Sequence, residues 1–322
     1  MRPREEERIR KWNGEVSGDI RIGLLVTGDK RSRELSEFCE NLARLAPKIR
    51  IVKEEGEPKE APAIRISSAL RYHAVPLGTE LEPFLEALSA SGEKSSLVPE
   101  HVRDQLEKIE LPAGLRLYVS RQCPFCPVTV RQIVPLLAAN ELVRLAIIDC
   151  DLFAEMAQLN GVRSVPTLLL DEQFRWTGQL HLEEVVEVIT NRDPAKLGAS
   201  SLQRMLREGN AVRLAEMMLD KEDIFPAFVD LLTHEKWPVR LGAMVAMEEI
   251  SGRNRQLAAR VIGPLWERFD HAGDTVKGDI IYILGESGDR RIAPRLEVIL
   301  AGEYDAEVKE AAKEALEKIV KQ

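Results

Sequence analysis

Two cysteines, Cys123 and Cys126, stand three positions apart with Pro124 and Phe125 between them. Thiols at this spacing can carry out dithiol–disulfide exchange: one thiolate attacks a partner's disulfide, and the second thiol resolves the mixed disulfide within the same chain. The same pair could instead supply half of a zinc site, or it could be a structural pair without chemistry. The two residues taken alone leave these three interpretations open.

The elements expected around the pair assign a role to each thiol. Residues 115–120 predict a strand and residues 127–140 a helix, so Cys123 follows a strand and Cys126 lies in the first turn of a helix. Free N–H groups and the positive end of the helix dipole favour a thiolate there and predict a lowered pKa. We expect Cys123, at the exposed edge of the turn, to be the nucleophile and Cys126, covered by the helix, to resolve.

A zinc site would need further ligands, and the chain offers no second cysteine pair. Cys39 falls in the middle of an amphipathic helix pattern, and Cys150 ends a strand beside two aspartates, which should raise its pKa. Neither looks reactive, although a redox role for Cys150 stays open. Four histidines are also not spaced from the cysteine pair as zinc ligands would be. They are His101, His181, His234 and His271. We therefore expect no metal and no cofactor.

The composition of the 322-residue chain indicates a compartment and excludes some partners. With 44% hydrophobic and 30% charged residues it resembles soluble globular proteins, and no apolar run approaches the roughly 20 residues of a membrane helix. The charged residues 1–16 lack the apolar stretch of a secretory signal, so we expect a cytoplasmic protein with reduced thiols. A net charge of −8 without a long basic stripe argues against a nucleic-acid partner.

Three segments with different periodicities predict an α/β part followed by an all-α domain. Residues 1–97 show the order strand, helix, strand, strand, strand, helix, and residues 98–194 repeat this order after a short helix. Each copy has a proline at the head of an apolar strand, Pro62 in the first and Pro166 in the second. Residues 195–322 show helical periodicity throughout.

The all-α segment contains an internal repeat in which Val239, Val276 and Val308 align, each followed by a basic residue. A proline near the start of the preceding helix accompanies each valine. These prolines are Pro226, Pro264 and Pro294. Each repeat is predicted to form a helical hairpin, and residues 201–220 are predicted to form a pair of helices that caps the repeats. The pattern resembles HEAT-type repeats across roughly residues 224–322, which implies a docking surface for a partner protein.

The surroundings of the cysteine pair resemble the thioredoxin and glutaredoxin superfamily. The resemblance rests on "CPFCP" at residues 123–127 and on "GVRSVPT" at Gly161 to Thr167. It implies that Pro166 is a cis-proline packed against the active-site sulfurs. The substrate-binding positions that it implies are Pro124, Phe125, Val165 and Thr167. A proline placed before an edge strand for local reasons is the alternative. The family's buried aspartate is replaced here by Leu117, so an acid–base group must come from elsewhere.

Residues 1–192 as a whole resemble the N-terminal domain of the flavoprotein subunit of alkyl hydroperoxide reductases and, more broadly, tandem-fold protein disulfide oxidoreductases. In both, two thioredoxin-like units are fused. The more specific motif is "VPLGTE", Val75 to Glu80. It implies that Glu80 lies near the cysteines, where it tunes the thiolate or relays a proton. A helix-start carboxylate favoured by the dipole is the alternative. The family's histidine before this glutamate is Thr79 here.

In the first copy "KRSR", Lys30 to Arg33, takes the place of the cysteine pair, so that copy is expected to support or dock. No G-x-G-x-x-G follows a predicted strand. We therefore predict a protein-disulfide oxidoreductase that receives electrons from a separate flavoprotein disulfide reductase and reduces protein disulfides such as that of a peroxiredoxin. Two alternatives stay open: a redox-sensitive scaffold whose HEAT-like repeats bind a partner, and glutathione-linked chemistry suggested by the Pro-Phe dipeptide.

Overall fold

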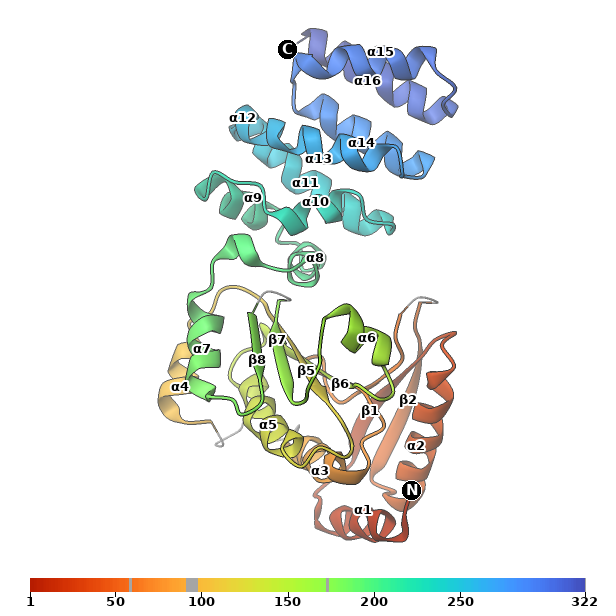
Figure 1. The fold of residues 1–322 in the computed structure, drawn as a ribbon, viewed down its shortest axis with the longest axis vertical. Coiled ribbons are helices and arrows are strands. Elements are labelled where there is room, and N and C mark those ends of the chain that lie inside the picture. The colour runs from red at the N-terminus through yellow and green to blue at the C-terminus, as the bar shows by residue number, and fades with distance from the viewer. Residues whose placement is uncertain (58–59, 91–97, 172–173, 322) are drawn as a thin grey trace. The chain divides into compact units, whose positions relative to one another are not determined.

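The computed structural model describes residues 1–57, 60–90, 98–171 and 174–321 and divides into two compact units (Figure 1). Unit 1 is Met1–Arg192, and unit 2 is Asp193–Gln322. The α/β part therefore ends at residue 192, where the sequence predicted 194. The boundary predicted after residue 97 lies outside the described residues.

Unit 1 is built on one mixed sheet, which has eight strands within the described residues. The strands are β1 (Ile20–Val26), β2 (Ile49–Glu55), β3 (Ala63–Arg65), β4 (Leu70–His73), β5 (Ala113–Val119), β6 (Val143–Asp149), β7 (Thr167–Leu170) and β8 (Phe174–Thr177). Their order across the sheet is β2-β1-β3-β4-β6-β5-β7-β8. The central strands are apolar along most of their length because helices cover both faces of the sheet (Figure 1).

The same arrangement of strands occurs twice in this sheet. Strand β1 pairs in parallel with β2 and antiparallel with β3, which pairs antiparallel with β4. Strands β5, β6, β7 and β8 repeat this pattern. We call residues 1–90 the first half and residues 98–192 the second half of unit 1. They join where β4 runs parallel to β6, so the segments predicted as two domains share one sheet and one core.

The helices of unit 1 follow the predicted order, with two differences. They are α1 (Pro3–Glu15), α2 (Arg31–Leu45), α3 (Leu81–Ala90), α4 (Glu100–Leu106), α5 (Cys126–Ile133), α6 (Ala154–Leu159) and α7 (Leu182–Asn191), with 3-10 turns η1 (Gly78–Glu80) and η2 (Val134–Ala138). The helix predicted over 127–140 is split between α5 and η2, because Pro135 has no N–H for the helical ladder. The sequence interpretation missed α6, which is short and has one buried residue, Ala157.

Unit 2 is helical throughout its described residues. Its elements are η3 (Pro194–Lys196), α8 (Ala199–Arg207), α9 (Ala211–Asp220), α10 (Pro226–Leu232), α11 (Trp237–Arg253), α12 (Arg255–Ala258), η4 (Ala259–Val261), α13 (Ile262–Phe269), α14 (Asp274–Glu286), η5 (Arg290–Ile292), α15 (Ala293–Ala301) and α16 (Ala306–Lys321). No helix in the described part of the chain is long and apolar enough to cross a lipid bilayer.

The internal repeat of the sequence coincides with the helices of unit 2. Val239, Val276 and Val308 are each the third residue of a long helix, in α11, α14 and α16 respectively. The three prolines lie in the first turns of α10, α13 and α15. Three helix pairs therefore follow one another, and α14 packs against both α11 and α16.

Candidate active site

The cysteine pair lies at the carboxyl edge of the sheet, between the end of β5 at Val119 and the start of α5 at Cys126. The backbone N–H of Cys126 donates a hydrogen bond to Sγ of Cys123 over 3.1 Å. Both cysteines are free thiols. Cys126 is fully buried, and Cys123 is 9% exposed. Cys123 is thus the sulfur that a partner can reach, although it is less exposed than the sequence predicted.

Burial, above all, and the hydrogen bond with Cys123 raise the pKa of the Cys126 thiol far above its usual range. The sequence predicted a lowered pKa for a thiol in the first helical turn. The prediction is wrong for Cys126, because the loss of water around this sulfur outweighs the favourable helix end. Cys126 therefore stays protonated until a base takes its proton, which suits a resolving thiol that waits for a mixed disulfide.

The segment before β7 faces the accessible sulfur. The Val165–Pro166 peptide bond is cis, the isomer that the sequence resemblance implied. Sγ of Cys123 lies 3.8 Å from the carbonyl oxygen of Val165. Pro124 and Phe125, which directly follow Cys123 in the chain, are exposed, and Phe125 retains 70% of its accessible surface. Three of the four predicted substrate-binding residues, Pro124, Phe125 and Val165, are thus at least partly exposed and lie close to Cys123 in the chain or in space.

Thr167, the fourth, turns inward. Its side chain is 1% exposed, and its hydroxyl donates to the carbonyl oxygen of Ser164 over 2.8 Å and lies 3.1 Å from the hydroxyl of Thr177. The alternation of side chains along β7 directs it into the protein. The side chain of Thr167 therefore fixes the loop before β7, and contact of this residue with a partner stays a prediction.

The first half contributes a turn to the active site. Thr79, in η1, donates hydrogen bonds to the carbonyl oxygen of Arg121 from its N–H over 3.2 Å and from its hydroxyl over 3.1 Å. The hydroxyl also lies 3.1 Å from the carbonyl oxygen of Cys123. Gly78 adopts φ +64°, and a Cβ at this position would lie 2.6 Å from the Arg121 carbonyl oxygen. A glycine is required here because the turn is left-handed and the two chain segments touch.

This turn places Glu80 inside the protein at the start of α3. Glu80 is 2% exposed, and neither carboxyl oxygen has a hydrogen-bond partner among the described residues. Burial, and then the charge of Asp149, raise the pKa of Glu80 to about 7. The charge of Glu80 in turn contributes to the raised pKa values of Cys126 and Tyr72. Burial therefore leaves the carboxyl group of Glu80 able to gain or lose a proton near neutral pH, whereas a helix-start carboxylate in water would be ionised.

The sequence interpretation did not single out Asp149, whose charge acts on Glu80, or Arg121, which pairs with Asp149. Asp149 ends β6 opposite Val119, is 1% exposed and has a pKa raised chiefly by burial. Arg121 Nε lies 3.1 Å from its Oδ2. An aspartate at the end of an apolar strand next to the cysteine strand was a usable signal, because the carboxyl ends of parallel strands meet at one edge of a sheet.

Neither of the other cysteines joins the site. Cys39 is fully buried in α2, and burial raises its pKa to about 12. Burial, followed by the charges of Asp149 and Asp151, raises the pKa of Cys150 to about 12. Among the described residues, no three His, Cys, Asp or Glu side chains gather closely enough to hold a metal ion. The candidate active site at this edge therefore consists of Cys123, Cys126 and Glu80.

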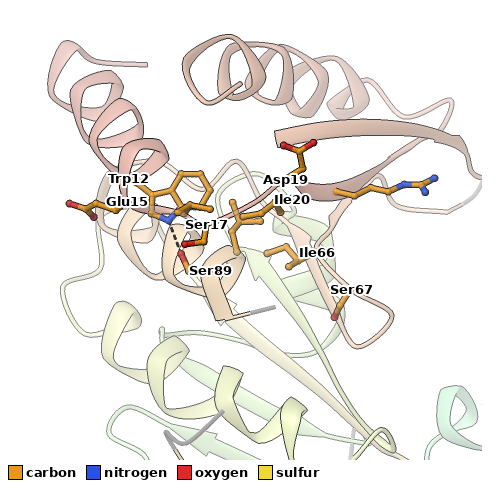
Figure 2. Close-up of a pocket in the computed structure, with 11 residues that line it drawn as sticks. Trp12, Glu15, Ser17, Asp19, Ile20, Ile66, Ser67 and Ser89 are labelled. Carbon is orange, nitrogen blue, oxygen red and sulfur yellow. Dashed lines mark hydrogen bonds between the residues drawn. The ribbon is translucent and has the colours of Figure 1, made fainter. Parts of the chain in front are cut away.

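A cavity of about 620 Å³ lies elsewhere in unit 1 (Figure 2). Its lining comes from the end of α1, the start of β1, the turn before β4 and the end of α3. Trp12 and Ser89 meet across it in a hydrogen bond of 2.9 Å (Figure 2). Because β1 and β5 run in the same direction, this cavity lies at the amino edge of the sheet, opposite the cysteines.

Comparisons with known proteins agree with this arrangement. A thioredoxin domain family model matches residues 115–190. The F subunit of alkyl hydroperoxide reductase from Xanthomonas campestris pv. phaseoli is 26% identical over an alignment of 193 residues, and the match covers 57% of this chain and 36% of that protein. The chain thus spans little more than a third of the length of this relative. The α/β part of the chain contains a thioredoxin-like domain.

Two solved structures share the fold. The NTD_N/C domain of alkylhydroperoxide reductase AhpF from Enterococcus faecalis superposes with a TM-score of 0.51 at 17% identity, covering 59% of this chain and 99% of that one. A protein disulfide oxidoreductase from Aeropyrum pernix K1 gives a TM-score of 0.54 at 13% identity, covering 61% and 95%. At these identities the likeness shows the fold alone.

Proposed function

We propose that the protein is a cytoplasmic thiol–disulfide oxidoreductase that passes two electrons from a flavoprotein disulfide reductase to protein disulfides. The observation that carries the proposal is the hydrogen bond from the Cys126 N–H to Sγ of Cys123 at the start of α5. This donor points at the sulfur that carries negative charge during exchange, and the neighbouring sulfur is buried and protonated.

The reaction has two exchange steps. The Cys123 thiolate attacks one sulfur of the partner's disulfide, an S–S bond forms between the proteins, and the other partner sulfur leaves as a thiolate. The Cys126 thiolate then attacks Sγ of Cys123 and releases the second partner sulfur. The partner's disulfide is reduced to two thiols, the Cys123–Cys126 pair is oxidised to a disulfide, and two electrons are transferred.

Glu80 supports the second step. Cys126 must lose its proton before it can attack, and its pKa is raised by burial. Glu80 has a pKa of about 7 and two buried oxygens without hydrogen-bond partners among the described residues, so it can accept this proton near neutral pH. When the reductase restores the dithiol, the same carboxyl group returns the proton. Glu80 thus takes the place of the missing aspartate at Leu117.

The partner would bind around Cys123. Phe125 and Val128 are exposed on the α5 side, and Val165 is half-buried on the other side with its backbone next to the sulfur. An extended partner segment can lie across this apolar surface with its disulfide above Cys123. A peroxiredoxin disulfide is our proposed acceptor because a relative is named as the F subunit of an alkyl hydroperoxide reductase.

A trapping experiment tests the proposal. Cys126→Ser removes the resolving thiol, so mixed disulfides with substrate proteins should accumulate on Cys123 and disappear on reduction. Cys123→Ser is the matched control and should trap nothing. In parallel, the wild-type protein should accelerate insulin reduction by dithiothreitol, and neither variant should. Absence of reducible adducts together with absence of insulin reduction would contradict the proposal.

A second candidate function, an interaction scaffold, is favoured by an apolar stripe on unit 2. Trp237, Leu241 and Val245 of α11 are 50, 40 and 42% exposed and lie on one face because they are spaced four residues apart. Beyond Val245 the helix continues with Glu248, which accepts a hydrogen bond from the hydroxyl of the exposed Tyr282 over 2.8 Å. This charge pattern fits an amphipathic partner helix with a basic residue one turn beyond its apolar side chains.

Binding of designed peptides tests the scaffold function. A labelled amphipathic Leu/Lys helix should bind the wild-type chain and lose affinity for Leu241→Asp, whereas a Leu/Glu helix of equal length should not bind. Equal binding of both peptides, or unchanged binding to the variant, would reject the stripe as a docking site. Dimerisation that is lost in Leu241→Asp would assign it to a second copy of the chain.

A further inference from the structure

The segment of the first half that replaces the cysteine pair reaches into the second half. Arg31 is the first residue of α2, at the same carboxyl edge of the sheet as Cys123. Its side chain is 14% exposed. On its own side it is held by Asp29, whose Oδ1 accepts from Nε over 2.9 Å. The remaining contacts of its guanidinium group are with residues more than 100 positions away.

Those contacts converge on the start of α6. Arg31 Nη1 donates to the carbonyl oxygen of Leu152 over 3.2 Å and pairs with the carboxylate of Glu155. The guanidinium carbon lies 4.1 Å from the ring centroid of Phe153, a cation–π contact. Phe153 is fully buried and directly precedes α6. The guanidinium group of Arg31 thus contacts a backbone carbonyl oxygen, a carboxylate and an aromatic ring at once. A planar group with five N–H donors can make such a set of contacts.

Helix α6 leads directly to the segment that faces Cys123. It has six residues, too few for a helix to be stable without tertiary contacts. After its end at Leu159 the chain turns back, with the N–H of Val162 bonded to the carbonyl oxygen of Ala157 over 2.8 Å, and it then reaches Val165 beside the sulfur. A shift of α6 at its start would therefore move the Val165–Pro166 edge.

We propose that Arg31 is a positioning residue that, from the half without a CxxC pair, holds α6 and with it the Val165–Pro166 edge where a partner protein docks. The guanidinium group is engaged by Asp29 and the start of α6, and Arg31 does not act on the chemistry of the two thiols. Its loss should weaken the recognition of protein disulfides and leave the intrinsic reactivity of Cys123 intact. The proposal rests on the proposed function, because it assigns this edge to partner binding.

The test compares Arg31→Ala with Arg33→Ala. Arg33 belongs to the same four-residue segment, is 85% exposed and pairs with Glu37 of its own helix, so its loss removes the same charge without touching the second half. For insulin reduction, Arg31→Ala should raise KM about tenfold with kcat within about twofold of the wild type, because the docking edge is displaced while the two thiols stay in place. The rate of Cys123 alkylation by iodoacetamide should change less than about twofold.

A second variant separates this role from folding. Glu155→Gln removes one ionic contact of Arg31 at a side chain that is 61% exposed, so the protein should fold, and KM should rise by about threefold, in the range of one exposed ion pair. Values of KM for both variants equal to that of Arg33→Ala would overturn the proposal. An equal loss of insulin reduction and of alkylation would also overturn it, since Arg31 would then only stabilise the fold.

Hydrogen exchange separates the failure of this proposal from failure of the proposed function. Amides of residues 154–166 should exchange faster in Arg31→Ala than in Arg33→Ala, whether or not the protein reduces insulin. If the wild type does not reduce insulin, the proposed function fails, and faster exchange still supports the positioning role. Unchanged exchange in this segment would overturn the role even in an active enzyme.

Discussion

The hydroxyl oxygen of Thr79 lies 3.1 Å from the carbonyl oxygen of Cys123, so the half of unit 1 without a CxxC pair directly contacts the loop that carries one. The same turn brings the buried Glu80 to the cysteines, and Gly78 allows its close approach to Arg121. The two halves of the duplicated fold thus contribute different residues to this edge of the sheet: the second half carries the two cysteines, and the first half carries Glu80 and Arg31.

Gly78→Ala should destabilise the protein and disturb the active loop. The new Cβ would meet the Arg121 carbonyl oxygen at 2.6 Å in a backbone with φ +64°. Gly18→Ala is the matched control, because Gly18 has φ +81° and nothing within 4 Å of its Cβ position. We expect about 1–2 kcal/mol of destabilisation for the control and about 3 kcal/mol or more for Gly78→Ala, measured by urea denaturation. Equal losses would show that the close approach does not matter.

Glu80→Gln should change how stability depends on pH. The pKa of Glu80 rises from 4.5 to about 7 on folding, so between these values the folded protein binds a proton that the unfolded chain has released. The wild type therefore loses stability as pH rises from about 4.5 to 7, by roughly 3 kcal/mol for a shift of this size. Glu80→Gln should lack this loss.

The measurement is urea denaturation of the reduced wild type and variant from pH 4 to pH 9. The variant should gain stability relative to the wild type through this window and keep the gain above pH 7. The rate at which Cys126 resolves a mixed disulfide should also lose its dependence on a group of pKa about 7 in the variant. Parallel stability curves would show that Glu80 ionises as an ordinary surface carboxylate.

Alkylation should distinguish the four thiols. At pH 8 iodoacetamide should label Cys123 first, because Cys126 is buried with a raised pKa and the pKa values of Cys39 and Cys150 lie near 12. A pKa of 12 leaves about one thiolate in 10⁴ at this pH. Mass spectrometry of peptides after short exposure provides the readout. Early labelling of Cys126 would reverse the assigned roles of the pair.

Arg240→Ala should strongly destabilise unit 2. Arg240 is 2% exposed, its Nε donates to Asp279 over 2.6 Å, and its Nη1 donates to the carbonyl oxygens of His234 and Glu235. Removing it leaves Asp279 without this partner, and breaking a buried pair costs about 3–5 kcal/mol. Arg253→Ala, which breaks the exposed pair with Glu249, should cost less than about 1 kcal/mol. Thermal unfolding of the full chain measures both, and equal effects would contradict the prediction.

Much of the local structure could be predicted because it depends on neighbouring residues. The apolar runs of β5 and β6, the start of a helix at the second cysteine, and the repeated valines of unit 2 all appear where expected. The exceptions also have local causes: Pro135 divides one predicted helix, and α6 is too short to show a period. The inward direction of Thr167 depends on the register of β7 with β5 and β8.

The sequence by itself determined the spacing of the two thiols. Because they lie three residues apart at the start of a helix, the N–H of Cys126 can donate a hydrogen bond to Sγ of Cys123 through local structure. Only the tertiary structure decided that Glu80 loses its water and titrates near 7, and that Arg31 holds a helix more than 100 residues away. Both depend on the pairing of β4 with β6, which joins the two halves in one sheet. Periodicity specifies which face of an element is buried, but desolvation and long-range contacts are set by which elements come to lie against it.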